Sequence, residues 1–165
     1  MGTIIEILLI ILGGIGLALI VGYFEDKIRM EKRKISLKES LDLAEIPIVT
    51  FTEGDTKLNF LLDTGSSDSH ISASAAKMCK ADAVDTEYTF TTGSGSGNAG
   101  KVLNTVLKYK NESFTVDLYV SESLDASFEA VKSNCGVQLH GILGSDFLRK
   151  HKYIMDFAEL IAYHK

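Results

Sequence analysis

Apolar and polar residues are distributed differently in three zones of the chain. From Ile7 to Phe24 a run of 18 uncharged, mostly aliphatic residues is unbroken, whereas residues 25–45 are charged and poor in glycine. From Ile46 onward apolar residues fall into short runs separated by turn residues, which is typical of β-strands. The pattern predicts one transmembrane α-helix in 1–24, a charged juxtamembrane helix and linker in 25–45, and a mostly β domain in 46–165.

Within residues 46–165 the apolar runs predict two hairpins, a closing pair of strands and short helices. One hairpin joins 46–51 to 57–63 through Glu53, Gly54 and Asp55, and another joins 101–110 to 113–121 around Asn111 and Glu112. A strand is expected at 87–90, a buried strand that ends at Gly144 in 136–148, and two short strands about Ala158 and Glu159 in 152–165. Short helices are expected at 72–81, with Ser72 or Ser74 as N-cap, and after Gly144, with Ser145 or Asp146 as N-cap, whereas 124–136 is expected to be a loop with a helical turn.

The apolar run near the N-terminus is long enough to predict a membrane anchor. At about 1.5 Å per residue, 18 residues nearly cross a hydrocarbon core of ~30 Å. A cleaved signal peptide is the alternative. Against it, no Lys or Arg precedes the run, and no small-x-small cleavage site is followed by a polar mature start. Residues 4–24 are therefore expected to contact the lipid bilayer in a single-pass membrane protein.

Basic residues flank the apolar run on one side only. By the positive-inside rule, which counts Lys and Arg, the C-terminal side is predicted to be cytoplasmic. A solvated helix face with Glu–Lys pairs is another interpretation of the same residues. The basic residues that follow the run are Lys27, Arg29, Lys32, Arg33, Lys34 and Lys38.

Small residues recur along one face of the apolar segment. Gly14, Ala18 and Gly22 are spaced four apart, so a helix places them in one strip. Such strips let two membrane helices approach closely, although glycine is common in membrane helices in any case. The strip is a weak indication that the anchors of two copies associate.

Charge and cysteine content exclude some functions. The net charge of −5 gives no reason to expect nucleic-acid binding. Cys79 and Cys135 lack the spacing and histidine partners of a zinc site, so no metal or other cofactor is expected. A disulfide between them is one interpretation, in an oxidising compartment; two unpaired thiols are the other.

One short polar segment carries the candidate chemistry. The apolar residues Leu61 and Leu62 are followed by Asp63, Thr64, Gly65, Ser66 and Ser67. Glycine allows a sharp turn, and the hydroxyls can orient a carboxylate by hydrogen bonds. An ordinary Asx or ST turn, in which Asp63 only accepts backbone amides, is the alternative.

The order of motifs along residues 46–165 resembles that of the retropepsin-like aspartic proteases, the single-lobe relatives of pepsin and of the retroviral proteases. The specific features are Leu61–Ser66 and the hydrophobic-hydrophobic-Gly motif of Ile142, Leu143 and Gly144, followed by Asp146 and Leu148. The closing YIMDF segment is also similar. The resemblance implies a small closed β-barrel of the acid protease type with one or two short helices.

The resemblance also implies roles for individual residues. Asp63 would be catalytic in a loop with Thr64, Gly65 and Ser66, and Ile142, Leu143 and Gly144 would support that loop. A glycine-rich hairpin would cover the substrate as a flap, since glycine permits the backbone freedom that closure needs; a Gly/Ser loop without function is the alternative. Tyr88 precedes this segment and is not assigned a catalytic role. The expected flap residues are Thr91, Thr92, Gly93, Ser94, Gly95, Ser96 and Gly97.

Catalysis of this kind needs two carboxylates around one water molecule. The sequence has no second Asp-Thr-Gly or Asp-Ser-Gly; Asp68 follows Asp63 too closely, and Asp146 lies beyond Gly144. The second acid is therefore expected to be Asp63 of another copy, in a C2 homodimer. A hydrogen bond donated by the Ser66 hydroxyl to Asp63 is expected to lower the pKa values of the two paired carboxylates. A hydroxyl that only stabilises the turn is the alternative. His70 and His140 are expected to be surface or hydrogen-bonded residues.

The sequence thus predicts a membrane-anchored, homodimeric aspartic endopeptidase. Its substrate would be a membrane-associated or cytoplasmic protein or peptide, or the enzyme itself. A catalytically inactive retropepsin-like module for dimerisation or peptide binding is the alternative function. A third interpretation is a secreted protein with Cys79 and Cys135 oxidised.

Overall fold

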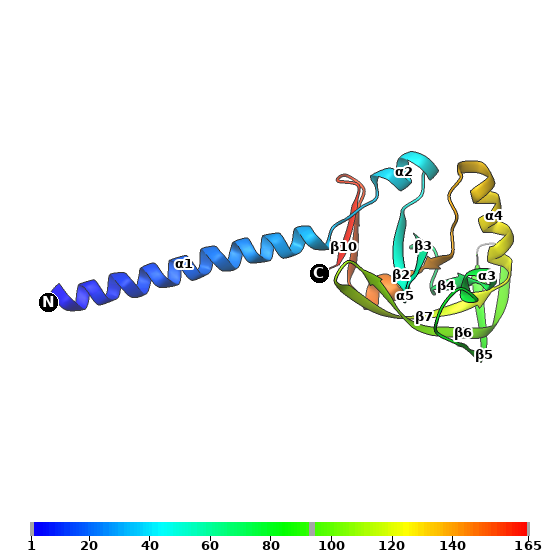
Figure 1. Ribbon diagram of the computed structural model, residues 1–165, viewed down its shortest axis with the longest axis horizontal. Coiled ribbons are helices and arrows are strands. Elements are labelled where there is room, and N and C mark those ends of the chain that lie inside the picture. Colours follow the sequence, from blue (N-terminus) through cyan, green and yellow to red (C-terminus); the bar gives the residue numbers. More distant parts are fainter. Residues whose placement is uncertain (1, 93–94, 165) are drawn as a thin grey trace. The chain divides into compact units, whose positions relative to one another are not determined.

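The structure, a computed structural model, describes residues 2–92 and 95–164, with side chains at 13–28, 33–89 and 98–164. The chain divides into two compact units, Met1–Lys34 and Ile35–Lys165. Helix α1 (Gly2–Arg33) forms the first unit (Figure 1). The second unit contains the described strands and the other described helices.

The first unit is one continuous helix of 32 residues. Large apolar side chains in its described part are exposed, with Leu19 at 70%. By length and apolar content, no helix within the described residues qualifies as a membrane-spanning segment. The anchor at residues 4–24 stays a prediction.

Six strands of the second unit close into a barrel. Strand β6 returns to β2 at the pair Thr52–Lys108, and this pairing closes the ring. Strand β5 (Ala83–Thr92) extends the sheet beyond β6. The closed, mostly β fold expected from the sequence is confirmed. The ring runs in the order β2 (Ile48–Glu53), β3 (Thr56–Leu62), β8 (Gly141–Leu143), β4 (His70–Ser72), β7 (Glu112–Ser121) and β6 (Gly95–Tyr109).

Both predicted hairpins are present. In the β2–β3 hairpin Glu53 pairs with Thr56, and Gly54 makes the turn with a φ of +57°. In the β6–β7 hairpin Tyr109 pairs with Glu112, so the turn begins one residue earlier than expected, at Lys110. Local turn chemistry was therefore a good guide to these two connections.

A second, three-stranded sheet contains both ends of the second unit. Its order is β1 (Ile35–Ser36), β10 (Ile161–His164) and β9 (Tyr153–Asp156). The closing strand pair was expected, but β1 lies in the segment predicted as helix and linker. Ile35 is buried opposite Ala162, and Leu37 is 0% exposed. Partners more than 120 residues away determine this strand, so no local pattern could indicate it.

The helices differ from the sequence prediction in length and capping. Ser72 caps α3 (Ala73–Ala76), which is much shorter than the predicted helix at 72–81. Helix α5 (Ser145–Lys150) begins after Gly144 as expected, but neither Ser145 nor Asp146 acts as its N-cap. Their side chains instead bind the loop after Asp63. A short helix α2 (Lys38–Ala44) precedes the barrel.

Helix α4 (Ser123–Cys135) occupies the segment 124–136, which was predicted as a loop with a helical turn, and is longer than that prediction. Leu124, Phe128 and Val131 recur at helical spacing and pack with Ile48 and Leu139 in a small second core. The polar residues between them obscured this stripe in the sequence. Gly136 ends the helix with a φ of +75°.

Aromatic residues fill the main core inside the barrel. Phe51 lies at its centre and makes edge-to-face contacts with Phe60, Phe114 and Phe147, with ring centroids 5.8 to 6.2 Å apart. Phe51 and Phe60 are fully buried. This core supports the β3 and β8 strands that lead into the candidate site.

Candidate active site

Asp63 lies directly after strand β3, which runs parallel to β8. Leu62 pairs with Leu143, and the Asp63 amide donates a hydrogen bond of 3.0 Å to the Leu143 carbonyl. Residues Ile142–Gly144 therefore lie beside the Asp63 loop, where the sequence placed them. The Asp63 side chain is half-buried.

The turn after Asp63 is tight at residue 65. The Gly65 amide donates a hydrogen bond of 2.8 Å to Asp63 Oδ1, and the Ser66 amide donates one of 3.3 Å to the Asp63 carbonyl. A Cβ atom at residue 65 would lie 3.1 Å from Asp63 Oδ1, closer than an ordinary contact. The backbone amide of Gly65 therefore orients the Asp63 carboxylate.

The Ser66 hydroxyl does not bind the Asp63 carboxylate in the structure. Its Oγ donates a hydrogen bond of 2.7 Å to the carbonyl oxygen of Asp68. The expectation that this hydroxyl lowers the pKa of the Asp63 pair thus lacks the contact it requires. The physical reason is the tightness of the turn, which points Ser66 along the loop instead of back toward Asp63.

Helix α5 holds the loop after Asp63 from the other side. The Ser145 amide donates to the Ser66 carbonyl at 2.8 Å, and the Asp146 amide donates to the Ser67 carbonyl at 3.1 Å. The Ser145 hydroxyl also bonds the Ser66 carbonyl, at 3.1 Å. Strand β8 therefore binds the start of the loop after Asp63, and helix α5 binds its continuation at Ser66 and Ser67.

The backbone at Gly144 passes very close to the backbone of the loop after Asp63. A Cβ atom there would lie 2.5 Å from the Asp68 carbonyl oxygen and 2.9 Å from that of Ser66. Both are backbone atoms, which cannot rotate away. Glycine is therefore required at residue 144 by close approach of two backbones.

The carboxylates nearest to the two motifs are occupied by other groups. Asp68 Oδ2 accepts a hydrogen bond of 2.7 Å from Ser67, and Asp146 Oδ1 accepts one of 2.7 Å from Ser69. The fully buried Ser69 hydroxyl also accepts the Gly144 amide, at 3.1 Å. Asp68 and Asp146 thus each accept a hydrogen bond from a serine of the loop after Asp63.

The expected flap coincides with the end of the β5–β6 hairpin. Thr91 pairs with Ser96, and Thr92 pairs with Gly95, while Gly97 lies opposite Phe90. Gly93 and Ser94 lie outside the described residues. The backbone described on either side of them is a continuous hairpin.

Two tyrosines beside the loop carry a contact that sequence reasoning missed. The rings of Tyr88 and Tyr119 are stacked, with centroids 3.9 Å apart and planes at 13°. A hydrogen bond to Asp68, together with burial, raises the pKa of Tyr88 to about 12. His70 is buried beside Tyr119, and burial lowers its pKa. These residues come from three strands, so no sequence signal brought them together.

His140 fits its expected role as a hydrogen-bonded residue. Its Nδ1 accepts a hydrogen bond of 2.9 Å from the Asn59 amide, and burial lowers its pKa. Over the described part of the chain, no group of three His, Cys, Asp or Glu side chains could hold a metal ion. Cys79 and Cys135 are free thiols.

A shallow hollow of about 640 Å³ opens beside the loop after Asp63. It runs from Thr64 past α5 to strand β9, and Phe157, at 55% exposure, stands at its edge. Strand β9 pairs with β10 on one side only, within the described sheet. An exposed apolar face next to an edge strand and the catalytic loop is a suitable surface for another protein chain.

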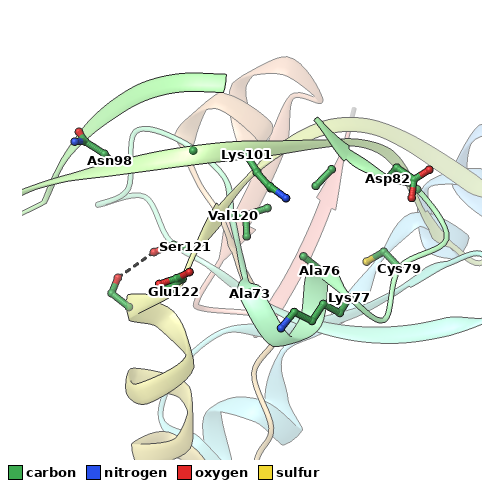
Figure 2. Close-up of a pocket in the computed structure, with 14 residues that line it drawn as sticks. Ala73, Ala76, Lys77, Cys79, Asp82, Asn98, Lys101, Val120, Ser121 and Glu122 are labelled. Atoms are coloured by element: carbon green, nitrogen blue, oxygen red, sulfur yellow. Dashed lines mark hydrogen bonds between the residues drawn. The ribbon is translucent and has the colours of Figure 1, made fainter. Parts of the chain in front are cut away.

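A larger hollow of about 810 Å³ lies elsewhere, between α3, β6 and the start of α4. Figure 2 shows Lys101 in the upper part of the view and Lys77 in the lower part, with Ala76 between them. No residue predicted to be catalytic, substrate-binding or supporting lines it. The larger hollow therefore does not coincide with the predicted site residues.

Comparisons with known proteins agree with this geometry. A family model described as aspartyl protease matches residues 49–147. Among solved structures, the retroviral protease-like domain of Ddi1 from Leishmania major is 16% identical with a TM-score of 0.52, over 73% of this chain and 88% of that one. The EIAV protease complexed with the inhibitor HBY-793 is 20% identical with a TM-score of 0.49, over 66% and 90%. A search of curated proteins found no match.

The family match spans more than half of the chain and includes both Asp63 and the Ile142–Gly144 motif. The Ddi1 domain has the same fold at low sequence identity. This chain belongs to the aspartyl protease family, as a single-lobe member with the retropepsin-like fold.

Proposed function

We propose that this protein is an aspartic endopeptidase that works as a homodimer, with one Asp63 from each copy in a shared active site. The observation that carries the proposal is the position of Asp63 in a loop held by β8 and α5. Asp68 and Asp146 accept hydrogen bonds from Ser67 and Ser69. Each chain thus supplies one of the two carboxylates that the chemistry needs.

The two Asp63 carboxylates would share one proton, because two adjacent like charges are costly. The ionised carboxylate takes a proton from a bound water, whose oxygen attacks the carbonyl carbon of the peptide bond. The protonated carboxyl donates its proton to the carbonyl oxygen. When the tetrahedral intermediate collapses, the C–N bond breaks, the amine nitrogen takes up the proton that the first carboxylate took from water, and a hydroxyl proton of the intermediate returns to the second carboxylate. The Gly65 amide keeps Asp63 oriented throughout.

The hollow beside Thr64 supports the choice of a second copy as partner. It adjoins the catalytic loop, so a chain seated there brings its own loop close to the first Asp63. Burial of Phe157 and of the β9 edge would stabilise the pair.

Phe157→Asp is expected to abolish cleavage and to separate the barrel units. Val84→Asp, at a 51% exposed position on β5, is the matched control and should do neither.

A mixing experiment tests the shared site directly. Full-length protein in detergent is assayed against a peptide library, alone and mixed with an equal amount of Asp63→Asn at constant total protein. If both carboxylates are needed, about one quarter of randomly formed dimers are active. A fall to only one half would mean that each copy acts alone. If wild type and Asp63→Asn are equally inert while both remain dimeric, the protein is the inactive binding module.

The proposed enzyme is anchored to a membrane by residues 4–24, with its barrel on the cytoplasmic side. The uncharged run from Ile7 to Phe24 and the basic residues after it support this proposal. Carbonate extraction of membranes should leave the protein bound, and external protease should spare the barrel in intact cells. Release by carbonate would contradict the anchor, and digestion would contradict its orientation.

The strip of Gly14, Ala18 and Gly22 would then bring two anchors together and raise the effective concentration of the barrels for each other. Replacing all three by Leu should lower activity in membranes. At low protein concentration in excess detergent, each chain occupies its own micelle, and the same change should have little effect on activity. Equal losses in both conditions would contradict this role.

A further inference from the structure

Ser69, in the loop after Asp63, is fully buried, and its hydroxyl bonds two groups at once. Its Oγ donates a hydrogen bond of 2.7 Å to Oδ1 of Asp146 and accepts one of 3.1 Å from the Gly144 amide. Because a hydroxyl has a single hydrogen, that hydrogen points to the carboxylate and a lone pair faces the amide. Both bonds are thus satisfied in one orientation of the hydroxyl.

The backbone around Ser69 holds this hydroxyl in place. The Ser69 carbonyl accepts a hydrogen bond of 3.0 Å from the Tyr119 amide of β7. The next residue, His70, begins strand β4 and pairs with Ile142 of β8. The Ser69 hydroxyl therefore cannot shift without disturbing the neighbouring strands.

The Gly144 amide that binds Ser69 and the Leu143 carbonyl that binds Asp63 belong to the same peptide group. The N–H side of this group donates to Ser69 Oγ, and the C=O side accepts the Asp63 amide at 3.0 Å. A peptide group is planar and rigid, so its N–H and C=O turn together. By holding the N–H, Ser69 sets the direction of the carbonyl to which Asp63 is bound.

A continuous chain of hydrogen bonds therefore leads from Asp63 to Asp146. The Asp63 amide donates to the Leu143–Gly144 peptide group, this group donates to Ser69, and Ser69 donates to the Asp146 carboxylate. The last bond is short, as expected for a hydroxyl bound to a charged acceptor. Bonds that run in one direction also polarise one another in a site shielded from water.

We propose that Ser69 and Asp146 are positioning residues that orient Asp63 through the Leu143–Gly144 peptide group. Neither side chain touches the reacting atoms in this proposal. Asp146 anchors Ser69, and Ser69 holds the peptide group that receives the Asp63 amide. The effect on catalysis rests on the proposed protease function, whereas the chain of bonds can be measured without it.

Hydrogen exchange of single amides, followed by NMR on the full-length protein in detergent, measures the positioning directly. With Ser69→Ala the Gly144 amide loses its acceptor and the peptide group can turn, so the Asp63 amide should exchange about tenfold faster. The Leu62 amide, which donates to the Pro47 carbonyl at 2.9 Å, should be unchanged. An unchanged Asp63 amide overturns the proposal. Equal acceleration at Leu62 also overturns it, because Ser69 then only stabilises the barrel.

Substitutions of Asp146 test the far end of the chain and do not depend on the folding of the Ser69 variant. Asp146→Asn keeps an oxygen acceptor for Ser69, so exchange of the Asp63 amide should stay within about threefold of wild type. Asp146→Ala removes that acceptor and should raise the exchange rate about tenfold. Adding Asp146→Ala to Ser69→Ala should change little, because both act through the same hydroxyl. Fully additive effects, or equal effects of Asn and Ala, would overturn the chain.

Ser121→Ala is the matched control for loss of a buried serine hydroxyl. Ser121 is 5% exposed and lies on β7, where its hydroxyl shares a hydrogen bond of 2.9 Å with Ser123. This variant should leave both the exchange of the Asp63 amide and peptide cleavage unchanged. A change in Asp63 exchange as large as that of Ser69→Ala would show that the effect is not specific to Ser69, and would overturn the proposal.

Cleavage assays separate this inference from the protease proposal. Ser69→Ala should lower kcat about tenfold or more and leave KM within about twofold, because a displaced Asp63 impairs the chemical step and not peptide binding. Asp146→Asn should restore most of the kcat that Asp146→Ala loses. Faster Asp63 exchange in a protein that cleaves no peptide would refute the protease and retain the positioning. Efficient cleavage by wild type with an unchanged kcat in Ser69→Ala would retain the protease and refute the positioning.

Discussion

Gly144→Ala should disrupt the loop after Asp63, because the added methyl group would meet backbone atoms of that loop. The added Cβ would lie 2.5 Å from the Asp68 carbonyl oxygen, whereas ordinary contacts begin at 3.4 Å. Either β8 or the loop must therefore move by about 0.9 Å. Overpacking of this kind costs about 2–3 kcal/mol, and the contacts here are backbone atoms with little freedom to give way.

The movement also has a catalytic consequence. Asp63 is positioned by the Leu143 carbonyl, one residue before Gly144, so a shift of β8 displaces the carboxylate. A misplacement of about 1 Å at a catalytic group can lower the rate about a hundredfold. Gly144→Ala is thus expected to lose activity beyond what its unfolded fraction explains.

Two other glycines provide matched controls. Gly136 has no atom within 4 Å of an added Cβ but a φ of +75°, so Gly136→Ala should cost about 1 kcal/mol by backbone strain, with normal activity. Gly100 has neither a close neighbour nor a positive φ, so Gly100→Ala should be neutral. Urea unfolding gives the free energies and peptide cleavage gives the rates. If Gly144→Ala is as stable and active as Gly100→Ala, the argument from backbone approach is wrong.

Three further predictions concern stability and are checked by urea unfolding. Leu37 is fully buried beside the terminal sheet, so Leu37→Ala should lower the free energy of unfolding by about 2–5 kcal/mol. For the same reason, a chain shortened to begin after residue 37 should not fold stably. Glu53→Gln should cost about 2 kcal/mol, because the buried carboxylate accepts bonds from two backbone amides and from Thr105, and an amide cannot accept all three. His140 has a lowered pKa in the folded state, so its contribution to stability is present above its unfolded pKa of 6.5 and is lost as the pH falls through the folded pKa. His140→Asn, which keeps an acceptor for the Asn59 amide, should flatten that loss between pH 6.5 and 5, whereas an unchanged slope would contradict it.

Features that depend on neighbouring residues were predictable. Turn residues at Gly54 and around Asn111 indicated two hairpins, and the Asp63–Gly65 and Ile142–Gly144 motifs indicated a site made of two segments. The structure places these two segments side by side through the parallel pairing of β3 with β8. Their spacing in sequence did not reveal this; the family resemblance did.

Features that depend on distant partners were not predictable. The Ile35–Ser36 strand exists because Ala162 and Ile161 pair with it, and the α4 helix exists because its apolar stripe meets Ile48 and Leu139. The direction of the Ser66 hydroxyl was predicted wrongly, since a hydroxyl in a tight turn takes the nearest acceptor that the turn presents. The Tyr88–Tyr119 stack likewise joins residues of β5 and β7, two strands that are not neighbours in the sheet.

The sequence by itself predicted both hairpins of the barrel, the closing pair of strands and the two motifs around Asp63 and Gly144, and it led to the hypothesis that a second copy supplies the other carboxylate. Only the tertiary structure decided which groups hold the Asp63 carboxylate, which backbone lies too close to Gly144 for a side chain, and which two tyrosine rings stack. The physical reason is the range of the interactions. Turn and strand preferences act over a few residues, whereas hydrogen bonds and close packing at the site join residues that are 80 positions apart, such as Asp63 and Leu143.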